Sequence, residues 1–420
     1  MIKLSSVAAR LDQAGPFLLG ALACTGVFAK GWASIAFGLL ALWGIYTLAR
    51  RPGSPPLPPG RWWAGLVIFG LTWLAAILAS GQYLLGLKYL GYWIYPIALI
   101  VSLAWLAFSQ RPDSVPWPRL MWGLGLMVVA VLTFREGGYR LICMRAKAHL
   151  GILELGSILG LLIPVMVAAF LHYLSIGCRN KTVFFALAIV AASVALNQNC
   201  ARQTMLAAPV ISLLLLWAYR HSFHGKPRRQ MLILALVMVV VLPLTFGSVG
   251  RLISTLEVKA DPESTSWVLN KSDELRLTIQ SLGWSVFQDN KLLGQGPGTV
   301  HLTHDAFPGK VLHSHNLFIH LLAESGIVGL AGFMALHLAP LSLIWPHRHS
   351  RDPETFFWVW AALAVSLQMF LNGMTDMVFG NKRVAFIYWT VITAALWQTQ
   401  RPPRPAQKFS QTIENEGQTK

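Results

Sequence analysis

The sequence predicts an all-α integral membrane protein with one long loop outside the membrane. Of its 420 residues, 55% are hydrophobic and only 12% are charged, whereas soluble domains carry roughly 25% charged residues. Apolar runs near the length of about 20 residues that a bilayer-spanning helix needs follow one another along most of the chain. One polar interval, residues 249–316, is long enough to form a substantial loop.

The apolar runs predict about twelve transmembrane helices. Nine precede the polar interval, in residues 1–248, and three follow it, in residues 317–400. The tail, 401–420, is rich in Pro and Arg and then polar, so we expect it to be disordered. No cleavable signal peptide is expected, because the first run is followed directly by a second. The predicted spans are 14–29, 32–49, 63–80, 90–108, 119–134, 152–174, 182–199, 203–219, 231–248, 317–345, 355–376 and 384–399.

The basic residues predict the orientation of the chain. A net charge of +17 would favour nucleic acid as the partner of a soluble protein, but in a membrane protein Lys and Arg gather in cytoplasmic loops. More than half of the 34 Lys and Arg residues fall on the same side of the predicted membrane as the two termini. We therefore expect cytoplasmic termini, no nucleic-acid partner, and segment 249–316 on the outer face.

The remaining basic residues gather on the predicted outer face, which favours an anionic ligand at the membrane surface. Arg145 and Lys147 lie between the fifth and sixth spans, and Arg202 begins the eighth. At that helix start, unpaired N–H groups and the positive end of the helix dipole add to the charge of Arg202, which suits phosphate. These cations could instead extend to lipid headgroups, and Arg202 could pair with Glu324 or Asp376.

The outer segment contains a predicted interfacial helix. Ser272 is a suitable N-cap with acidic residues after it, so we expect a helix over 272–287 that lies against the membrane or the bundle, with Arg276 beside its apolar face. That face comprises Leu275, Ile279, Leu282 and Val286. The following turn, 294–298, contains three glycines that could bring backbone amides to a ligand, although an ordinary connection explains them more simply.

A polar motif stands where the outer segment meets the tenth span. Histidine can accept a proton near neutral pH, so His315 is the candidate general base, with His313 as the alternative. Asn316 could orient the histidine or a substrate, and Gly326 and Gly329 would allow close helix packing. The structural alternative for the histidines is a helix cap or a solvated side chain.

Other polar residues near the motif have simpler interpretations. We expect His320 to pack or hydrogen-bond internally. Glu324 lies about 13 Å from His315 by helix rise, so it should pair with an Arg inside the bundle and not orient the base. Cys143 and Cys200 both fall on the outer face, where they could form a disulfide.

A metal site is a further alternative for the histidines. His301, His304, His313 and His315 could gather an ion, but the acids near them in the sequence are Asp305 and Glu324, and no short metal-ligand spacing is present. No metal or other cofactor is therefore expected.

The motif also carries a resemblance to a known family. His315-Asn316, nine residues, and then Gly326-Ile-Val-Gly329 resemble the H-[NSQ]-x9-G-x-x-G pattern of the O-antigen ligase family. Arg276, Trp284 and the glycines of 294–298 are similar to the periplasmic loop of the broader ligase/polymerase superfamily.

The resemblance implies a GT-C-like glycosyltransferase of the bacterial inner membrane. Such a ligase moves O-antigen from undecaprenyl pyrophosphate to a sugar hydroxyl of lipid A–core at the periplasmic face, with inversion and without a metal, which completes lipopolysaccharide. In that chemistry His315 would be the base. Arg202 and Arg276, with Arg145 and Lys147, would hold the pyrophosphate amid the surrounding membrane lipid.

Two other classes remain open. An O-antigen polymerase or a protein O-oligosaccharyltransferase would use the same donor, and the compact length disfavours the protein acceptor. A lipid or sugar transporter would place charge in the middle of its spans, whereas the polar residues here lie mainly at outer ends.

Overall fold

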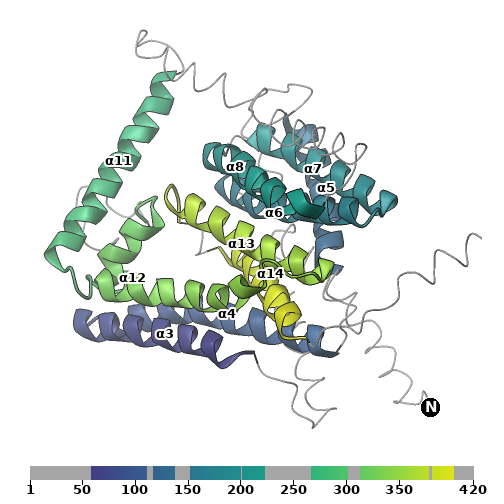
Figure 1. The fold of residues 1–420 in the computed structure, drawn as a ribbon. Helices are drawn as coiled ribbons and strands as arrows, with labels where there is room; N and C mark the ends of the chain where they lie inside the picture. Colours follow the sequence, from purple (N-terminus) through teal and green to yellow (C-terminus); the bar gives the residue numbers. More distant parts are fainter. Residues whose placement is uncertain are drawn as a thin grey trace, which may run out of the picture.

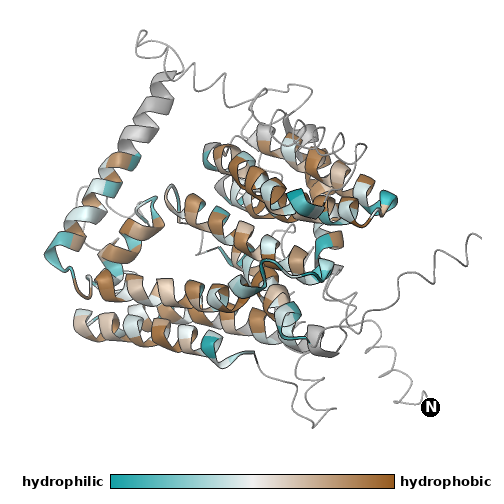
Figure 2. Ribbon diagram, viewed as in Figure 1, coloured by the Kyte–Doolittle hydropathy of each residue, from teal (hydrophilic) through white to brown (hydrophobic). Residues whose placement is uncertain are grey.

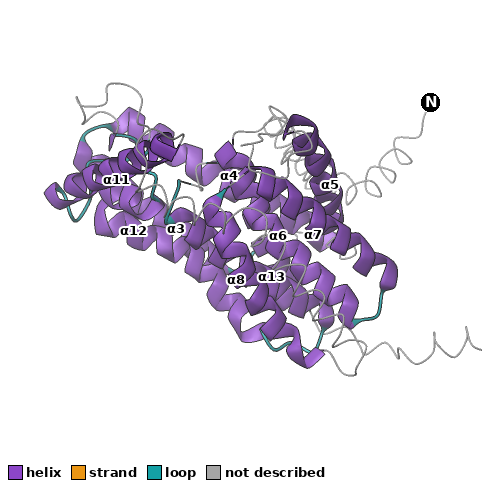
Figure 3. Ribbon diagram, turned by 90° about the horizontal axis from the view of Figure 1, so that it is seen from above, coloured by secondary structure: helices purple, strands orange, loops and turns teal. Residues whose placement is uncertain are grey.

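The computed structural model describes residues 58–110, 117–137, 152–199, 201–222, 266–300, 313–377 and 381–401. Within these residues the chain forms helices, short turns and loops, and no strand (Figures 1 and 3). The predicted spans 14–29, 32–49 and 231–248 lie outside the described residues. So do Arg145, Lys147, both outer cysteines, and His301 and His304.

Every other predicted span is a helix, and the predicted all-α class is confirmed for the described residues. The observed bounds differ from the predicted ones by a few residues at most ends, because polar residues flank the apolar runs without interrupting the helix. The long helices are α3 Gly60–Ser80, α4 Tyr83–Gln110, α5 Trp117–Gly137, α6 Ile152–Ser175, α7 Arg179–Asn199, α8 Arg202–Tyr219, α11 Ser266–Asp289, α12 Leu317–Ile344, α13 Pro353–Gly373 and α14 Lys382–Gln400, with short 3₁₀ turns η2 Arg220–Ser222 and η6 Trp345–His347.

Seven of the described helices are long and apolar enough to cross a membrane, namely α3, α4, α6, α7, α8, α12 and α13. The apolar part of α5 is shorter, Arg119–Leu132. Helix α14 is also not among the seven, and most of its side chains, including Thr390, Thr393 and Gln398, are buried in the bundle. A helix surrounded by other helices does not need a wholly apolar surface. The described part of the chain therefore contains fewer candidate transmembrane helices than the twelve predicted for the whole chain.

The bundle is organised around α6, whose span is entirely buried. Helix α6 packs against α7, α8 and α13, while α14 lies between α13 and α4, and α12 runs along α3. Glycines allow α12 and α3 to pack closely. A Cβ at Gly332 of α12 would collide with Thr72 of α3, and one at Gly65 of α3 would lie 2.9 Å from the carbonyl oxygen of Ala335 on α12. Apolar residues cover most of the length of these helices (Figure 2).

Helix α11 extends away from the bundle and makes its main contacts with α12 (Figure 1). It begins at Ser266, six residues before the predicted N-cap Ser272, so that prediction is wrong. No Pro or Gly lies between these two residues to stop the helix from extending. Three of the four residues of the predicted apolar face fit the prediction, since Ile279 and Val286 are buried and Leu282 is partly buried, and the side chain of Leu275 lies outside the described part.

Candidate functional site

The candidate site lies where the beginning of α12 meets the end of α13. Asn316 is the N-cap of α12: its side-chain oxygen accepts hydrogen bonds from the N–H groups of Phe318 (3.0 Å) and Ile319 (3.1 Å). Its amide nitrogen donates to the carbonyl of Met374, just beyond α13, over 2.9 Å. Asn316 thus ties the two helix ends together, which favours a positioning role over the direct substrate contact that the sequence also allowed.

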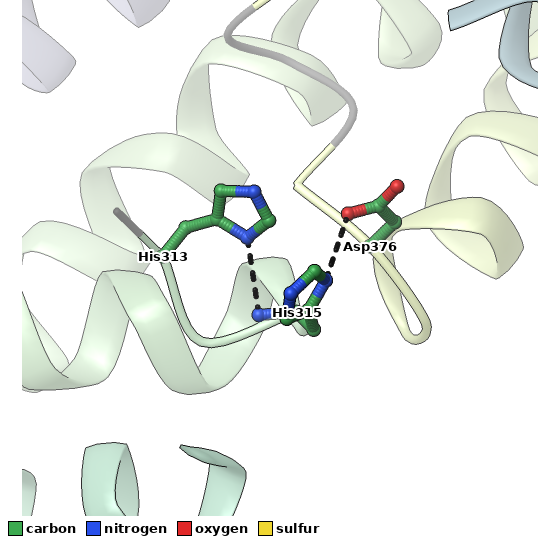
Figure 4. Close-up of side chains that lie close together, drawn as sticks. All are labelled: His313, His315 and Asp376. Carbon is green, nitrogen blue, oxygen red and sulfur yellow. Dashed lines mark hydrogen bonds and ion pairs between the residues drawn. The ribbon is translucent and has the colours of Figure 1, made fainter. Parts of the chain in front are cut away.

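His313, His315 and Asp376 face one another at this junction (Figure 4). Nδ1 of His315 lies 3.6 Å from Oδ1 of Asp376, and the backbone N–H of His315 donates to Nδ1 of His313 over 3.3 Å. The two imidazole rings are T-shaped with centroids 4.4 Å apart. His315 has a φ of +48°, which is rare for a residue with a side chain and is frequent at functional sites.

The surroundings shift the pKa values of His313 and Asp376. Burial lowers the pKa of His313 to about 4, with a further contribution from neighbouring His315, so His313 is neutral at physiological pH. Burial alone would raise the pKa of Asp376, but its contacts with His315 and with the N–H of Met377 lower it below the ordinary value. An aspartate anion therefore faces Nδ1 of His315, and Nε2 of that ring is left for another partner.

Asp376 is the functional candidate whose role sequence reasoning missed. The sequence suggests Asp376 only as a possible partner of Arg202, because no motif or spacing relates Asp376 to His315. The only signal was its position at the outer end of the predicted span 355–376. His315, with 24% of its side chain exposed, is accessible from outside the bundle, and the Asp376 carboxylate is buried behind it.

Helix α11 carries Arg276 near the site, and its role in binding a substrate remains a prediction. Arg276 is partly buried, and its charge contributes to lowering the pKa of His313. One turn further, the side-chain amide of Gln280 donates to the carbonyl of His315 over 3.3 Å. Gly283 lets α11 approach closely, because a Cβ there would lie 2.7 Å from Oγ of buried Ser314.

Helix α8 begins at Arg202, as the sequence predicts, and its N-cap Ala201 offers no side-chain hydrogen bond to the first turn. Backbone N–H groups of that turn are thereby left without a side-chain cap, and the anion site at Arg202 remains a prediction. Thr204 donates to the carbonyl of Gly156 on α6, and a Cβ at Gly160 would lie close to both Thr204 and Asn372 of α13. The start of α8 therefore packs near the end of α13 that leads to Asp376.

Gly326 has a different role from the helix packing that the sequence predicts. Its φ of +64° and ψ of −167° break α12. The break is filled by the loop after α11: Lys291 and Leu292 accept from the N–H groups of Ile327 (2.9 Å) and Val328 (3.2 Å). A Cβ at Gly326 would collide with the carbonyl of Leu292. We call this contact between residues 291–298 and the break in α12 the loop clamp.

Glu324 belongs to the other half of the loop clamp, and its partners differ from the Arg that the sequence predicts. Gln295 and Gly296 donate to the carbonyls of Ala323 (3.0 Å) and Glu324 (2.8 Å). The Glu324 side chain accepts from the N–H of Gly298 over 2.9 Å, and its second oxygen lies 3.3 Å from Nε2 of His320. In the described part of the chain Glu324 thus pairs with a histidine and a backbone amide, and the expected Arg partner is not observed.

His320 and Gly329 fit their predictions more closely. His320 is fully buried, and its contact with Glu324 is internal to α12. Gly329 packs at close range, since a Cβ there would collide with Ser325 and lie 3.6 Å from Nε1 of Trp73 on α3. The glycines of the motif therefore serve both the loop clamp and the contact between α12 and α3.

Arg383, at the beginning of α14, is paired with an acidic residue. It lies 3.0 Å from Oε1 of Glu154, which also accepts from the side chain of Asn381 over 2.9 Å. This ion pair links the beginnings of α6 and α14. The charge of Arg383 is therefore neutralised by Glu154 within the bundle.

Comparison with known protein families gives a match over part of the chain. Residues 187–334 match the sequence model of a family described as O-antigen ligase, and no match was found among curated proteins. The matched region contains the second part of α7, all of α8 and α11, and the larger part of α12, and with them Arg202, Arg276, His313 and His315. Asp376 lies beyond it. Over this region the match is to the same family that the histidine–glycine motif resembles.

Proposed function

We propose that this chain, whose residues 187–334 match the O-antigen ligase family model, is an O-antigen ligase of the bacterial inner membrane. It joins O-antigen from undecaprenyl pyrophosphate to a sugar hydroxyl of lipid A–core at the periplasmic face and so completes lipopolysaccharide. The observation that carries this proposal is the contact between His315 and Asp376 at an accessible end of the bundle, beside the cation Arg276.

His315 is the general base of the proposed reaction. A sugar hydroxyl is a weak nucleophile, so its proton must leave as its oxygen bonds to the anomeric carbon. Asp376 faces Nδ1 and stabilises the imidazolium that forms when Nε2 takes this proton. The separation of 3.6 Å is slightly longer than a hydrogen bond, and such contacts commonly shorten when substrate binds. His313 is the alternative base, although its low pKa makes it the weaker one.

The donor requires positive charge at its leaving group. As the bond between the anomeric carbon and the pyrophosphate oxygen breaks, the electron pair departs with the lipid pyrophosphate, and attack from the opposite face inverts the carbon. Arg276 and the beginning of α8 at Arg202 would stabilise that charge. Arg145 and Lys147 are proposed to assist them from the segment between α5 and α6. This chemistry needs no metal.

The distribution of buried charge supports an enzyme over a transporter. Among the described residues, the buried charged side chains are Arg119, Glu324, Asp376 and Arg383, and each lies near a helix end or a helix break. A transporter would instead place charge near the membrane midplane. We propose that the end with His315 faces the periplasm and that both chain termini are cytoplasmic, in accord with the predicted basic loops.

Transfer by purified protein tests the proposal. Undecaprenyl-pyrophosphate glycan and lipid A–core are incubated with wild type, His315→Ala and Asp376→Asn in the presence of a chelator, and glycan on lipid A–core is measured. Transfer by wild type and its loss in folded variants is the expected result. Elongation of glycan on its own carrier would establish a polymerase, and glycan on protein an oligosaccharyltransferase. Movement of lipid without any transfer would establish a transporter.

A further inference from the structure

The same three side chains also form a cluster with the composition of a metal site. One possible ligand atom from each of His313, His315 and Asp376 lies within 4.8 Å of the other two. Bonds of about 2.0–2.1 Å to a tetrahedral ion place ligand atoms about 3.4 Å apart. The 3.6 Å between Nδ1 of His315 and Oδ1 of Asp376 is already close to that spacing. Side-chain rotations that shorten the longest of these separations by about 1.4 Å would bring His313 within reach.

The donor types select the ion. Two imidazoles and one carboxylate are a ligand set for Zn²⁺, whereas Mg²⁺ and Ca²⁺ prefer oxygen alone. Both histidines are only partly buried, so an ion can enter and keep a fourth position for water or substrate. A second observation points the same way: Nδ1 of His315 is buried without a hydrogen-bond partner, because the Asp376 carboxylate is slightly too distant.

The backbone holds the two imidazoles together without help from an ion. The positive φ of His315 turns the chain so that residues two apart face each other, and the N–H of His315 bonds to the ring of His313. Asn316 and Gln280 fix the same segment to α13 and α11. The ligands are thus held in place by the fold, which reduces the entropy lost when an ion binds.

We propose that His313, His315 and Asp376 form a Zn²⁺-binding site at which the ion inhibits the enzyme. The inhibitory part rests on the proposed function of His315 as base. Coordination uses the lone pair of the histidine nitrogen, so a zinc-bound His315 is less able to accept a proton from the acceptor hydroxyl. The ion also occupies the carboxylate of Asp376 that would stabilise the imidazolium.

Direct binding tests the site without any assay of activity. Full-length protein is purified in detergent, stripped with a chelator, and titrated with Zn²⁺ in competition with a fluorescent zinc indicator. Wild type should bind one ion that is displaced by chelator, and affinity should fall by at least about 10-fold in His313→Ala and in Asp376→Asn. The matched control is the double variant His347→Ala, His349→Ala at the far end of α12, which should retain the wild-type site.

Transfer measured at increasing Zn²⁺ tests the inhibitory role. Activity of wild type should fall over the range in which this site fills, recover on chelation, and be unaffected by Mg²⁺ at the same concentration. His313→Ala and the His347/His349 control are each compared with their own metal-free activity, and Asp376→Asn, which is expected to lose transfer, is used only in the binding titration.

The outcomes separate the two proposals. Equal Zn²⁺ affinity in wild type and the ligand variants overturns the site, and so does binding that disappears only in the His347/His349 control. Transfer that is unchanged or increased at saturating Zn²⁺ overturns the inhibitory role. If wild type makes no transfer even with chelator, the proposed function fails, while the binding titration still decides whether the zinc site exists.

Discussion

Arg119 and His315 lie toward opposite ends of α13 and differ in how completely they are partnered. Glu354, which contacts Arg119, is the second residue of α13, and Asp376, which contacts His315, follows its last turn. A helix of 21 residues separates these ends by roughly 30 Å. Each end therefore joins a cation or a potential cation to a carboxylate, but in different surroundings.

The Arg119 end is closed. The guanidinium is 1% exposed, lies 3.0 Å from one oxygen of Glu354, donates to the hydroxyl of Tyr173 over 2.6 Å, and stacks over the ring of Phe357 at 4.4 Å. His172 adds a contact to the same carboxylate. These contacts join α5, α6 and α13, so this cluster is a structural tie.

The His315 end is open. Its imidazole is 24% exposed, its contact with Asp376 is longer, and its backbone is in a strained conformation. A group with an unused ring nitrogen and an accessible edge can exchange protons or bind an ion, whereas a buried guanidinium paired with a carboxylate cannot. The difference indicates that stability depends on the first cluster and reactivity on the second.

The largest expected effect follows from removing the base. Replacing His315 by Ala should lower transfer by about 10²–10⁴-fold, the usual contribution of a general base, while the unfolding temperature stays near that of wild type. Transfer kinetics and thermal unfolding are measured on the same preparations, with His349→Ala as the matched exposed control. Nearly normal transfer in folded His315→Ala would show that His315 is not the base and that the reaction does not depend on this end of α13.

The closed cluster should respond in the opposite way. Arg119→Met should destabilise the protein by about 3 kcal/mol, the lower part of the range for a broken buried ion pair, because Glu354 keeps His172 and some contact with water. Transfer per folded molecule should be unchanged. In thermal unfolding, the double variant with Glu354→Gln should recover part of the loss. A stable Arg119→Met variant with reduced transfer would show that this cluster is not a structural tie.

The sequence predicts the helices better than it predicts the site. Apolar runs locate the spans because burial or lipid contact imposes a length and a composition on each helix. The pairing of His315 with Asp376 depends on how two helix ends meet, and no local pattern encodes that distance. The break at Gly326 was missed for a related reason: a glycine in an apolar run fits either close packing or a positive φ, and the loop that fills the break is recognised only in three dimensions.

The loop clamp links α11, with Arg276, to the helix that follows His315, so it allows a third test. Gly326→Ala should cost about 1–3 kcal/mol from the unfavourable φ, with an added collision with Leu292, and should also lower transfer by displacing α11. Gly91→Ala in α4 is the control, because a Cβ there meets nothing within 4 Å. Thermal unfolding and transfer are compared for both. Equal behaviour of the two variants would exclude the loop clamp as a positioning device.

The smallest expected effect is a dependence of the free energy of unfolding on pH, which His313 causes. Its pKa is about 4 in the folded protein and 6.5 as the ordinary value, so between these pH values the unfolded chain binds a proton that the folded chain does not. The stability associated with neutral His313 is therefore complete above pH 6.5 and is lost as the pH falls toward 4. Because the ring is only partly buried, we expect about 1 kcal/mol rather than the full linkage value.

This dependence is measured by thermal unfolding of wild type and His313→Gln at a series of pH values, with chelator present to exclude bound metal. Glutamine does not titrate, so the variant should lose less stability than wild type between pH 6.5 and 4, and the two curves should run parallel above pH 6.5. Parallel curves over the whole range would mean that His313 is not held neutral by its surroundings. The open end would then differ from the Arg119 end in exposure alone, and the neutral imidazole beside His315 would lose its part in the site.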